Sequence, residues 1–427
     1  MSMIQGVKEF IGELELKKKL SPWQNPNIAW FYIFFPSLIA YFMLMAQNLN
    51  AKPIIGSFDI VHLPQFHKII PKNAELELLI DDVKWAEGPV WIEESSSGLG
   101  HLLFSDTIDN KIFKWEEGKG MFTIGKTLYL DHSGCFSGNN ACNNGAKDEP
   151  GSNGILEQSI TEFKNNPDDI DLLVCQHGDR AISLMRSNGT RTWVVRSYNG
   201  SRLNSPNDLI QSPDGHVYFT DPIYGLYQTD HTSNESSEGN DGNHSNKDKK
   251  GERKINPNDV DLNFSGVYMI PAVEYAKAIS TGRPASRIIL LDDKLTRPNG
   301  LAFSPDYSKL YVTNSDENNK VIMVYDISED GKGTVSNGRV FYNATAANLN
   351  GEGNLDGMTV DIHGNMLVAG PGGVLILTAR GTLLGRLRLP KRATNVVFGD
   401  YGRIYITGDG MVVRTKISTR PLKAIRR

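Results

Sequence analysis

Short alternations of apolar and polar residues, each interrupted by a turn, recur along most of the chain. The clearest example is Ser205–Asp221, in which an apolar run, a turn at Pro213–Gly215 and an alternating run at His216–Thr220 follow one another. An Asp-Gly pair between two such runs is typical of a β-hairpin. This stretch therefore predicts two antiparallel strands joined by a tight turn.

The same pattern returns along the chain, and each copy carries a polar residue just before its first strand. Repeats of roughly 40–60 residues, each a small antiparallel sheet, are typical of propeller blades. Their spacing fits an all-β, six-bladed propeller over residues 75–420. Because innermost strands start at the central channel, the polar residues are expected to converge on one axis. They are Glu87, Asn207, Asn299, Asp356 and Asn395.

The stretches around the repeats predict how the ring is closed and interrupted. Glu75–Ile80 alternates like a strand and is expected to complete the last blade, which removes exposed sheet edges. Asp131–Pro167 is polar and rich in glycine, which predicts a long loop, and Asp171–Gly178 then predicts the inner strand of blade two. Residues 228–261 contain few apolar side chains, which predicts a disordered insertion.

The N-terminal part has a different pattern. Residues 28–46 are apolar and uncharged, and 19 helical residues would span about 28 Å, close to the hydrocarbon thickness of a bilayer. Lysines concentrate before this segment, which favours a signal anchor with residues 1–27 as a cytosolic tail, 47–74 as an irregular neck and the propeller lumenal or extracellular. A cleaved signal peptide, which would release a secreted protein, and a buried soluble helix stay open as alternatives.

Sequons and cysteines agree with a lumenal or extracellular propeller. Cys135 and Cys142 lie close together in the glycine-rich stretch and could pair in an oxidising compartment, although unpaired cysteines stay open, whereas Cys175 lies in an apolar strand as a buried thiol. Asn-X-Ser/Thr sequons predict glycosylation. They occur at Asn188, Asn199, Asn234, Asn243, Asn263 and Asn343.

Composition and charge narrow the functional classes. The formal net charge is −4, from 45 Lys and Arg against 49 Asp and Glu, so no basic excess suggests nucleic-acid binding. The sequence has no phosphate-binding glycine loop, no paired CxxC and no Gly-X-Ser-X-Gly nucleophile elbow. The remaining candidate chemistry lies at the propeller axis.

Three of the axial residues have the chemistry of metal ligands. Glu87, Asn299 and Asp356 offer two carboxylates and a carboxamide oxygen, which suit Ca²⁺ first and Mg²⁺ or Mn²⁺ next. Asn and Asp also begin turns for local reasons, so turn formation is the alternative. Glu87 favours the metal interpretation, because glutamate is a poor turn residue.

Several other residues have a structural and a functional interpretation. His177 is a candidate for a proton shuttle or substrate contact, with a structural histidine as the alternative, and Asp208 either orients Asn207 or forms a turn. Tyr224 and Trp91 either line the pocket or pack in the core. Three aspartates that follow second strands are expected to cap turns, namely Asp106, Asp221 and Asp316.

Five motifs in a fixed order resemble the gluconolactonase branch of the SMP-30/gluconolactonase/LRE family. The resemblance covers about residues 82–417 and departs from the family at the N-terminal segment and at residues 228–261. The family's usual substrate-binding arginine of the early blades has no secure match. The motifs are Glu87–Trp91, Ser205–Asp208, Arg297–Leu301, Leu355–Met358 and Val368–Val374.

This resemblance implies a six-bladed propeller with one divalent cation on the axis, Ca²⁺ first and Zn²⁺, Mg²⁺ or Mn²⁺ otherwise, that hydrolyses lactone rings. It implies Glu87, Asn299 and Asp356 as metal ligands, Asn207 as a metal or substrate contact, and Asp356 as the general base. His177 is a further candidate substrate contact. The expected partner is a small-molecule lactone, with the protein a monomer or dimer held to a membrane by its N-terminal segment.

Two other functions stay open at this point. The same centre could hydrolyse aryl esters or organophosphates, and a non-catalytic propeller could instead present a face to a protein partner. Fold alone does not decide between these functions.

Overall fold

The hairpin predicted at residues 205–221 is present, with strands β13 (Leu209–Gln211) and β14 (Val217–Asp221) paired antiparallel. Gly215 closes the turn with a φ of 92°, a left-handed conformation that glycine adopts without strain. The backbone N–H of Gly215 donates to the carbonyl of Ser212 over 2.9 Å. This hairpin forms the inner half of one blade.

The computed structural model describes most of the chain after residue 51. All described residues belong to one compact unit. The described ranges are 52–93, 100–117, 125–135, 148–158, 170–229, 253–400 and 402–422.

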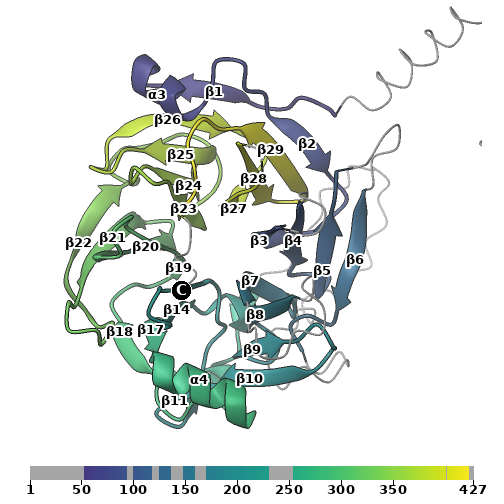
Figure 1. Ribbon diagram of the computed structural model, residues 1–427, viewed down its shortest axis with the longest axis vertical. Helices are drawn as coiled ribbons and strands as arrows, with labels where there is room; N and C mark the ends of the chain where they lie inside the picture. Colours follow the sequence, from purple (N-terminus) through teal and green to yellow (C-terminus); the bar gives the residue numbers. More distant parts are fainter. Residues whose placement is uncertain are drawn as a thin grey trace, which may run out of the picture. The chain divides into compact units, whose positions relative to one another are not determined.

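Within this unit, six antiparallel sheets are arranged around a central axis, which confirms the six-bladed propeller (Figure 1). The first three blades, from the innermost strand outward, have the following strands. They are β3 (Ala86–Glu93), β4 (Gly100–Asp106), β5 (Lys111–Trp115) and β6 (Lys126–Asp131); β7 (Ser152–Gln158), β8 (Asp171–Gln176), β9 (Ala181–Met185) and β10 (Arg191–Val195); and β13, β14, β17 (Gly266–Ile270) and β18 (Ile289–Asp292).

The last three blades continue the same order. They contain β19 (Pro298–Phe303), β20 (Lys309–Asp316), β21 (Asn319–Ile327) and β22 (Val335–Asn343); β23 (Met358–Val360), β24 (Met366–Gly370), β25 (Gly373–Leu377) and β26 (Leu383–Arg388), with β1 (Ser57–Ile60) outermost; and β27 (Ala393–Phe398), β28 (Arg403–Gly408) and β29 (Met411–Lys416), with β2 (Glu77–Ile80) outermost.

Strand β2 closes the ring as predicted, because it pairs with β29, the last strand of the chain. Arg414 on β29 donates to Glu77 on β2 over 2.6 Å, and its guanidinium lies 5.6 Å from the ring of Trp115 in blade one. The final blade is therefore built from both ends of the propeller sequence.

The described part of the predicted irregular neck at residues 47–74, which begins at residue 52, contains regular elements. Strand β1 pairs with β26 as a fifth strand of blade five, and helix α3 (Leu63–Ile69) follows it. Phe66 of α3 is only 1% exposed and packs in the core beside Leu367 and Leu387. The apolar residues of this short segment therefore belong to a helix that packs against blade five.

Blade two also differs from the sequence prediction. Its innermost strand is β7, which lies inside the stretch expected to form a loop, and β8 is the second strand. Strand β7 pairs with β8 from Ser152↔Gln176 to Gln158↔Asp171. The first residues of β7 are polar or glycine and only its later part is apolar, so the strand signal in the sequence is weak.

The insertion of blade three is structured at both of its described ends. Strands β15 (Tyr227–Thr229) and β16 (Arg253–Ile255) form a two-stranded ladder, and the 3₁₀-helix η5 (Pro257–Asp259) follows. The middle of the predicted insertion, residues 230–252, lies outside the described residues.

Smaller elements decorate the blades. The helix α4 (Ala272–Thr281) connects β17 to β18, and the 3₁₀-helix η3 (Tyr224–Leu226) follows β14. A short ladder joins β11 (Ser197–Tyr198) to β12 (Ser201–Arg202).

The core consists of apolar side chains packed between neighbouring blades. Trp91 of blade one stacks on Tyr405 of blade six, with ring centroids 5.1 Å apart. Phe219 and Tyr268 stack within blade three at 5.2 Å. Trp91 is therefore a packing residue, as one of its two interpretations expects.

The structure leaves the N-terminal and covalent predictions as predictions. The predicted anchor at residues 28–46 and the tail before it lie outside the described residues, as do Cys142, Asn234 and Asn243. No helix among the described residues is both long and apolar enough to cross a bilayer.

Cys175 and the described sequon residues have the burial that the sequence predicts, and glycosylation itself stays a prediction. Cys175 is a free, fully buried thiol, and burial raises its pKa well above the ordinary value. The four described sequon asparagines have exposed side chains, and they are Asn188, Asn199, Asn263 and Asn343.

Candidate active site

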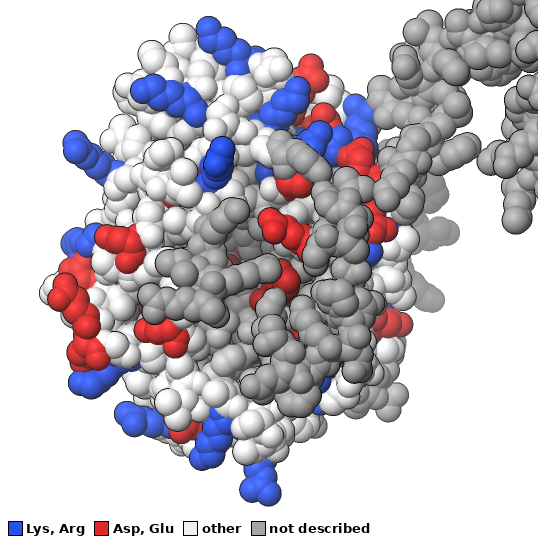
Figure 2. Space-filling view, viewed as in Figure 1, with Lys and Arg blue, Asp and Glu red and all other residues white. Residues whose placement is uncertain are grey.

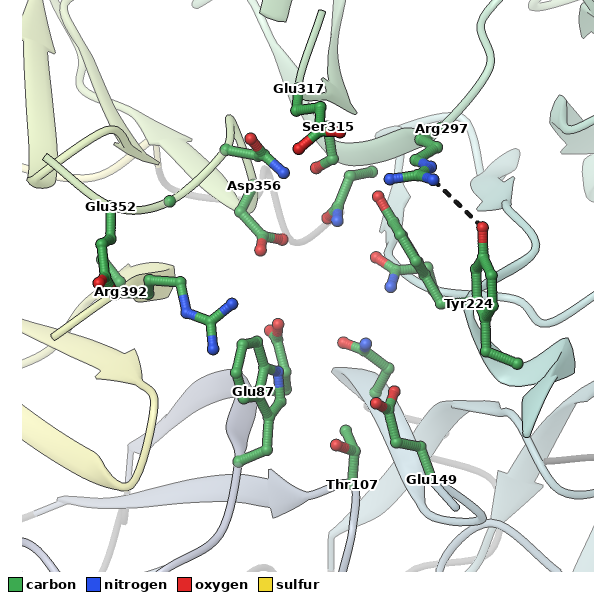
Figure 3. Close-up of a pocket in the computed structure, with 18 of the residues that line it drawn as sticks. Glu87, Thr107, Glu149, Tyr224, Arg297, Ser315, Glu317, Glu352, Asp356 and Arg392 are labelled. Atoms are coloured by element: carbon green, nitrogen blue, oxygen red, sulfur yellow. Dashed lines mark hydrogen bonds between the residues drawn. The ribbon is translucent and has the colours of Figure 1, made fainter. Parts of the chain in front are cut away.

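Polar side chains at the starts of the innermost strands converge on a central cavity of about 1040 Å³. Four of the predicted axial residues line it, namely Glu87, Asn207, Asn299 and Asp356. Figure 3 shows the carboxyl groups of Glu87, from blade one, and Asp356, from blade five, pointing into the same space. Asn395, the fifth predicted axial residue, is not part of the lining.

Asn153 on β7 is a cavity residue that the sequence prediction missed. It occupies in blade two the place that Glu87 has in blade one, and it is 5% exposed. A signal for it was present, because Asn153 is followed by glycine and an apolar residue, as Asn299 and Asp356 are. The loop expected at this stretch obscured it.

Glycine follows these polar residues because a larger residue would clash with the backbone of a neighbouring blade. A Cβ on Gly88 would lie 2.1 Å from the carbonyl oxygen of Asn153, and one on Gly154 would lie 2.8 Å from that of Asn207. Each glycine thus makes room for the backbone of the next blade's axial residue. This close packing brings the axial side chains to a common point.

Hydroxyl groups on the second strands fix the same backbone positions. In three blades they donate to the carbonyl oxygen of the axial residue in the next blade, so these three axial residues are held by two blades. The bonds are Ser105 to Asn153 at 3.0 Å, Thr220 to Asn299 at 2.8 Å and Thr313 to Asp356 at 2.9 Å.

Replacing Gly300 with Ala should disrupt the site through this packing. A Cβ there would lie 2.5 Å from the carbonyl oxygen of Asp356 and 2.8 Å from the Cα of Gly357, both backbone atoms. We expect a loss of about 1–3 kcal/mol in the free energy of unfolding, measured by denaturant titration. Gly125→Ala is the matched control, because nothing lies within 4 Å of its Cβ position. Equal stability of both variants would contradict the steric explanation.

The cavity destabilises ionised carboxylates when no cation is bound. Burial raises the pKa of Asp356 to about 8, and repulsion from Asp208 adds to the shift. Burial, followed by repulsion from Asp356 and Asp208, raises the pKa of Glu87 well above its ordinary value. Three acidic groups share one buried region, which a positive charge would stabilise.

Asp208 connects neighbouring blades, and its hydrogen-bond partners among the described residues do not include the side chain of Asn207. Its carboxylate accepts the backbone N–H of Leu209 over 2.8 Å and also accepts from the N–H of Leu301 and the side chain of Asn395. Burial raises its pKa to about 6. Asp208 therefore links three blades around the axis and does not line the cavity.

The donor set of the cavity fits a hard divalent cation. Glu87 and Asp356 supply carboxylates, Asn207 and Asn299 supply carboxamide oxygens, and the Oδ1 atom of Asp356 is buried without a hydrogen-bond partner among the described residues. Across the described residues, no three His, Cys, Asp or Glu side chains form a metal-holding group. Any cation here must therefore rely on the carboxamides as well.

Some of the remaining predicted residues line the cavity, and others form hydrogen bonds that stabilise the fold. His177 lines the cavity from the end of β8 and is 1% exposed, and Tyr224 also lines it. The aspartates at the ends of the second strands accept backbone N–H groups. Asp316 does so within the turn that follows it, as predicted, whereas the shortest bond to Asp106 and the bonds to Asp221 come from the segments before the innermost strands of their blades. The bonds run to Asp106 from Lys84 at 2.8 Å, to Asp221 from Asn204 and Ser205 at 2.8 Å each, and to Asp316 from Asn318 at 2.9 Å.

Charged side chains complete the lining. Acidic groups are Asp148, Glu149, Glu317 and Glu352, and Figure 2 shows acidic side chains beside the central hollow. Basic groups are Arg297, Lys320 and Arg392. Arg297 donates to the hydroxyl of Tyr227 over 3.1 Å, the bond drawn as a dashed line in Figure 3.

Comparison with known proteins identifies relatives of the whole propeller. A gluconolactonase of Zymomonas mobilis is 31% identical over 379 residues, which cover 87% of this chain and 89% of that protein. The structure of a gluconolactonase from Xanthomonas campestris matches with a TM-score of 0.61 at 26% identity, covering 86% of this chain and 98% of the other.

A more distant structure shares the fold. The calcium-binding protein regucalcin from Agrobacterium tumefaciens matches with a TM-score of 0.52 at 14% identity, over 81% of this chain and 94% of the other. The profile described as the SMP-30/Gluconolactonase/LRE-like region matches residues 85–409, which contain most strands of the six blades and every axial residue. The chain therefore belongs to the SMP-30/gluconolactonase/LRE-like family.

Proposed function

We propose that this protein is a metal-dependent hydrolase that opens lactone rings. The observation that carries the proposal is the convergence of Glu87 and Asp356, with Asn207 and Asn299, in one cavity of a gluconolactonase-like propeller. The gluconolactonase relatives support a small cyclic ester as substrate. The cavity volume of about 1040 Å³ accommodates such a ring.

In this proposal, different side chains of the cavity bind the cation, contact the substrate and transfer the proton. Glu87, Asp356, Asn207 and Asn299 would hold the cation, Ca²⁺ being the best match to their oxygen atoms. When bound, this cation supplies Lewis acidity for the lactone carbonyl and for a water molecule. The Asn207 carboxamide holds a substrate oxygen.

Asp356 is the proton acceptor in this proposal. In the reaction, water adds to the acyl carbon, the bond from that carbon to the ring oxygen breaks, and the ring oxygen leaves as a hydroxyl group. The Asp356 carboxylate takes the proton from water and returns it to the leaving oxygen, as a general base and then a general acid. The product is a hydroxy acid.

Proton release on addition of a lactone tests the proposal. We expect the full chain with Ca²⁺ to release protons from glucono-1,5-lactone or a γ-lactone, and an excess of chelator to abolish the enzymatic part, because the carboxylates alone leave the carbonyl unactivated. A pH-stat separates this rate from spontaneous hydrolysis.

Parallel substrates distinguish the alternatives. Faster turnover of an aryl acetate or a phosphotriester than of any lactone would favour an ester or organophosphate hydrolase with the same centre. No turnover of lactones or esters, with the protein folded and loaded with Ca²⁺, would overturn the enzymatic proposal in favour of a protein-binding propeller.

A further inference from the structure

One cationic side chain of the cavity has a hydrogen-bonding group that the protein leaves unused. Arg392 lies directly before β27 and lines the cavity. Figure 3 shows its guanidinium reaching toward the space between Asp356 and Glu87. Its charge lowers the pKa of Asp356, against the larger effects that raise it, so the two groups interact electrostatically.

Two contacts hold the Arg392 guanidinium in this position. Its Cζ lies 4.8 Å from the ring centre of Trp85, an arrangement typical of a cation–π interaction. Its Nη2 donates to Asp409 over 3.1 Å, and the backbone N–H of Asp409 donates to the Arg392 carbonyl over 3.0 Å. The side chain is therefore oriented before any ligand arrives.

The remaining polar face of Arg392 lacks an acceptor. Its Nε is buried and has no hydrogen-bond partner among the described residues. A guanidinium stays protonated at every working pH, and a buried donor without an acceptor costs about 1–3 kcal/mol. The terminal nitrogens of the guanidinium face the cavity, and Asp409 uses one of their donors, so donors remain for a ligand oxygen.

Two other arginines are held by different partners. Arg297 donates to Tyr227. Arg180, in the early blades, is fully buried and donates to the carbonyls of Leu203 and Asp259, away from the cavity lining. Among these three arginines, Arg392 is the one whose charge acts on Asp356 and whose guanidinium reaches the space between Asp356 and Glu87.

The charge of the surroundings indicates which ligand oxygen Arg392 suits. Hydrolysis of a lactone creates a carboxylate where a neutral acyl group was. The lining is mainly acidic, so a product carboxylate would be repelled unless a cation faced it. A guanidinium matches a carboxylate through charge-assisted hydrogen bonds.

We propose that Arg392 binds the acyl group at this centre, donating to the carbonyl oxygen of the lactone and more strongly to the carboxylate of the opened hydroxy acid. The inference rests on the proposed lactone hydrolysis. It assigns to blade six a ligand-binding arginine that the early blades do not supply.

Product inhibition tests this role. Arg392→Gln removes the charge and should raise the Ki for gluconate by about 10-fold or more, because a hydrogen bond to a charged group contributes about 1.5–3 kcal/mol. It should also raise the KM for the lactone, by a smaller factor. Lys320→Gln is the matched control, since it removes another cation of the lining and should leave both constants within about twofold.

Calorimetric binding of gluconate to the Ca²⁺-loaded protein gives a readout that needs no turnover. Asp409→Asn, which loosens the guanidinium without removing it, should shift the Kd in the same direction by less, and covers the case in which Arg392→Gln fails to fold. An unchanged Ki and Kd in either folded variant, or an equal change in Lys320→Gln, would overturn the inference while leaving lactone hydrolysis intact. Absence of turnover in the unmodified protein would instead overturn the proposed function.

Discussion

Replacing Asp356 with Asn should lower kcat for lactone hydrolysis by about a thousandfold or more at saturating Ca²⁺. The substitution keeps the size of the side chain and one oxygen for the cation, but it removes the group that accepts the proton from water. General-base catalysis contributes about 10²–10⁴-fold in enzymes, and weaker holding of the cation adds to the loss. Initial rates in a pH-stat, measured over a range of Ca²⁺ concentrations, separate these two effects.

Glu317→Gln is the control for Asp356→Asn, because it makes the same chemical change at another carboxylate of the same cavity. We expect this control to keep kcat within about threefold. If Asp356→Asn retained full kcat once Ca²⁺ was saturating, Asp356 would be neither the base nor an essential ligand, and the proposed mechanism would fail.

The protein stripped of cations should become less stable as pH rises from 5 to 8. The pKa of Asp356 is about 8 in the folded state and near 3.8 ordinarily, so between these values the folded protein holds a proton that the unfolded chain has lost. Stability from this group is complete at low pH and is lost as pH rises through the folded pKa. Glu87, whose pKa is also raised, contributes with the same sign.

The expected effect is several kcal/mol, since each unit of pKa difference corresponds to about 1.4 kcal/mol. It should appear as a fall in the melting temperature of about 5 °C or more across this pH range in chelator. Added Ca²⁺ should restore most of the loss at pH 8, because a cation that binds only the folded state stabilises it.

With Ca²⁺ present, the melting temperature should still fall somewhat as pH rises, because burial outside the cavity raises the pKa of Asp221 to about 7. A melting temperature in chelator that stayed flat or rose between pH 5 and 8 would contradict the electrostatic description of the cavity. A rise in melting temperature on adding Ca²⁺ that was as large at pH 5 as at pH 8 would contradict it as well.

Local patterns determined much of the architecture before any coordinates. The turn at Pro213–Gly215 and its repeats predicted hairpins, the spacing of the copies predicted six blades, and the alternation at Glu75–Ile80 predicted the strand that closes the ring. These signals are strong because strand alternation and turn chemistry act between residues that are near in sequence. Four axial residues at the cavity followed from the same repeats.

The innermost strand of blade two and the helix α3 escaped prediction for a related reason. Strand β7 begins with Ser152–Gly154, small and polar residues that are held by close contacts with blades one and three. Helix α3 is short, and its helical form depends on burying Phe66 against blade five. Tertiary packing overrode local propensity in both places.

What the sequence determined by itself is the repeating strand pattern, the blade number and the identity of most polar residues at the axis. Only the tertiary structure decided that Glu87 and Asp356 share one buried space, that their pKa values rise together, and that Arg392 lies over Trp85 facing them. Burial and charge repulsion depend on distances in space between residues far apart along the chain. Those distances exist only once the ring has closed.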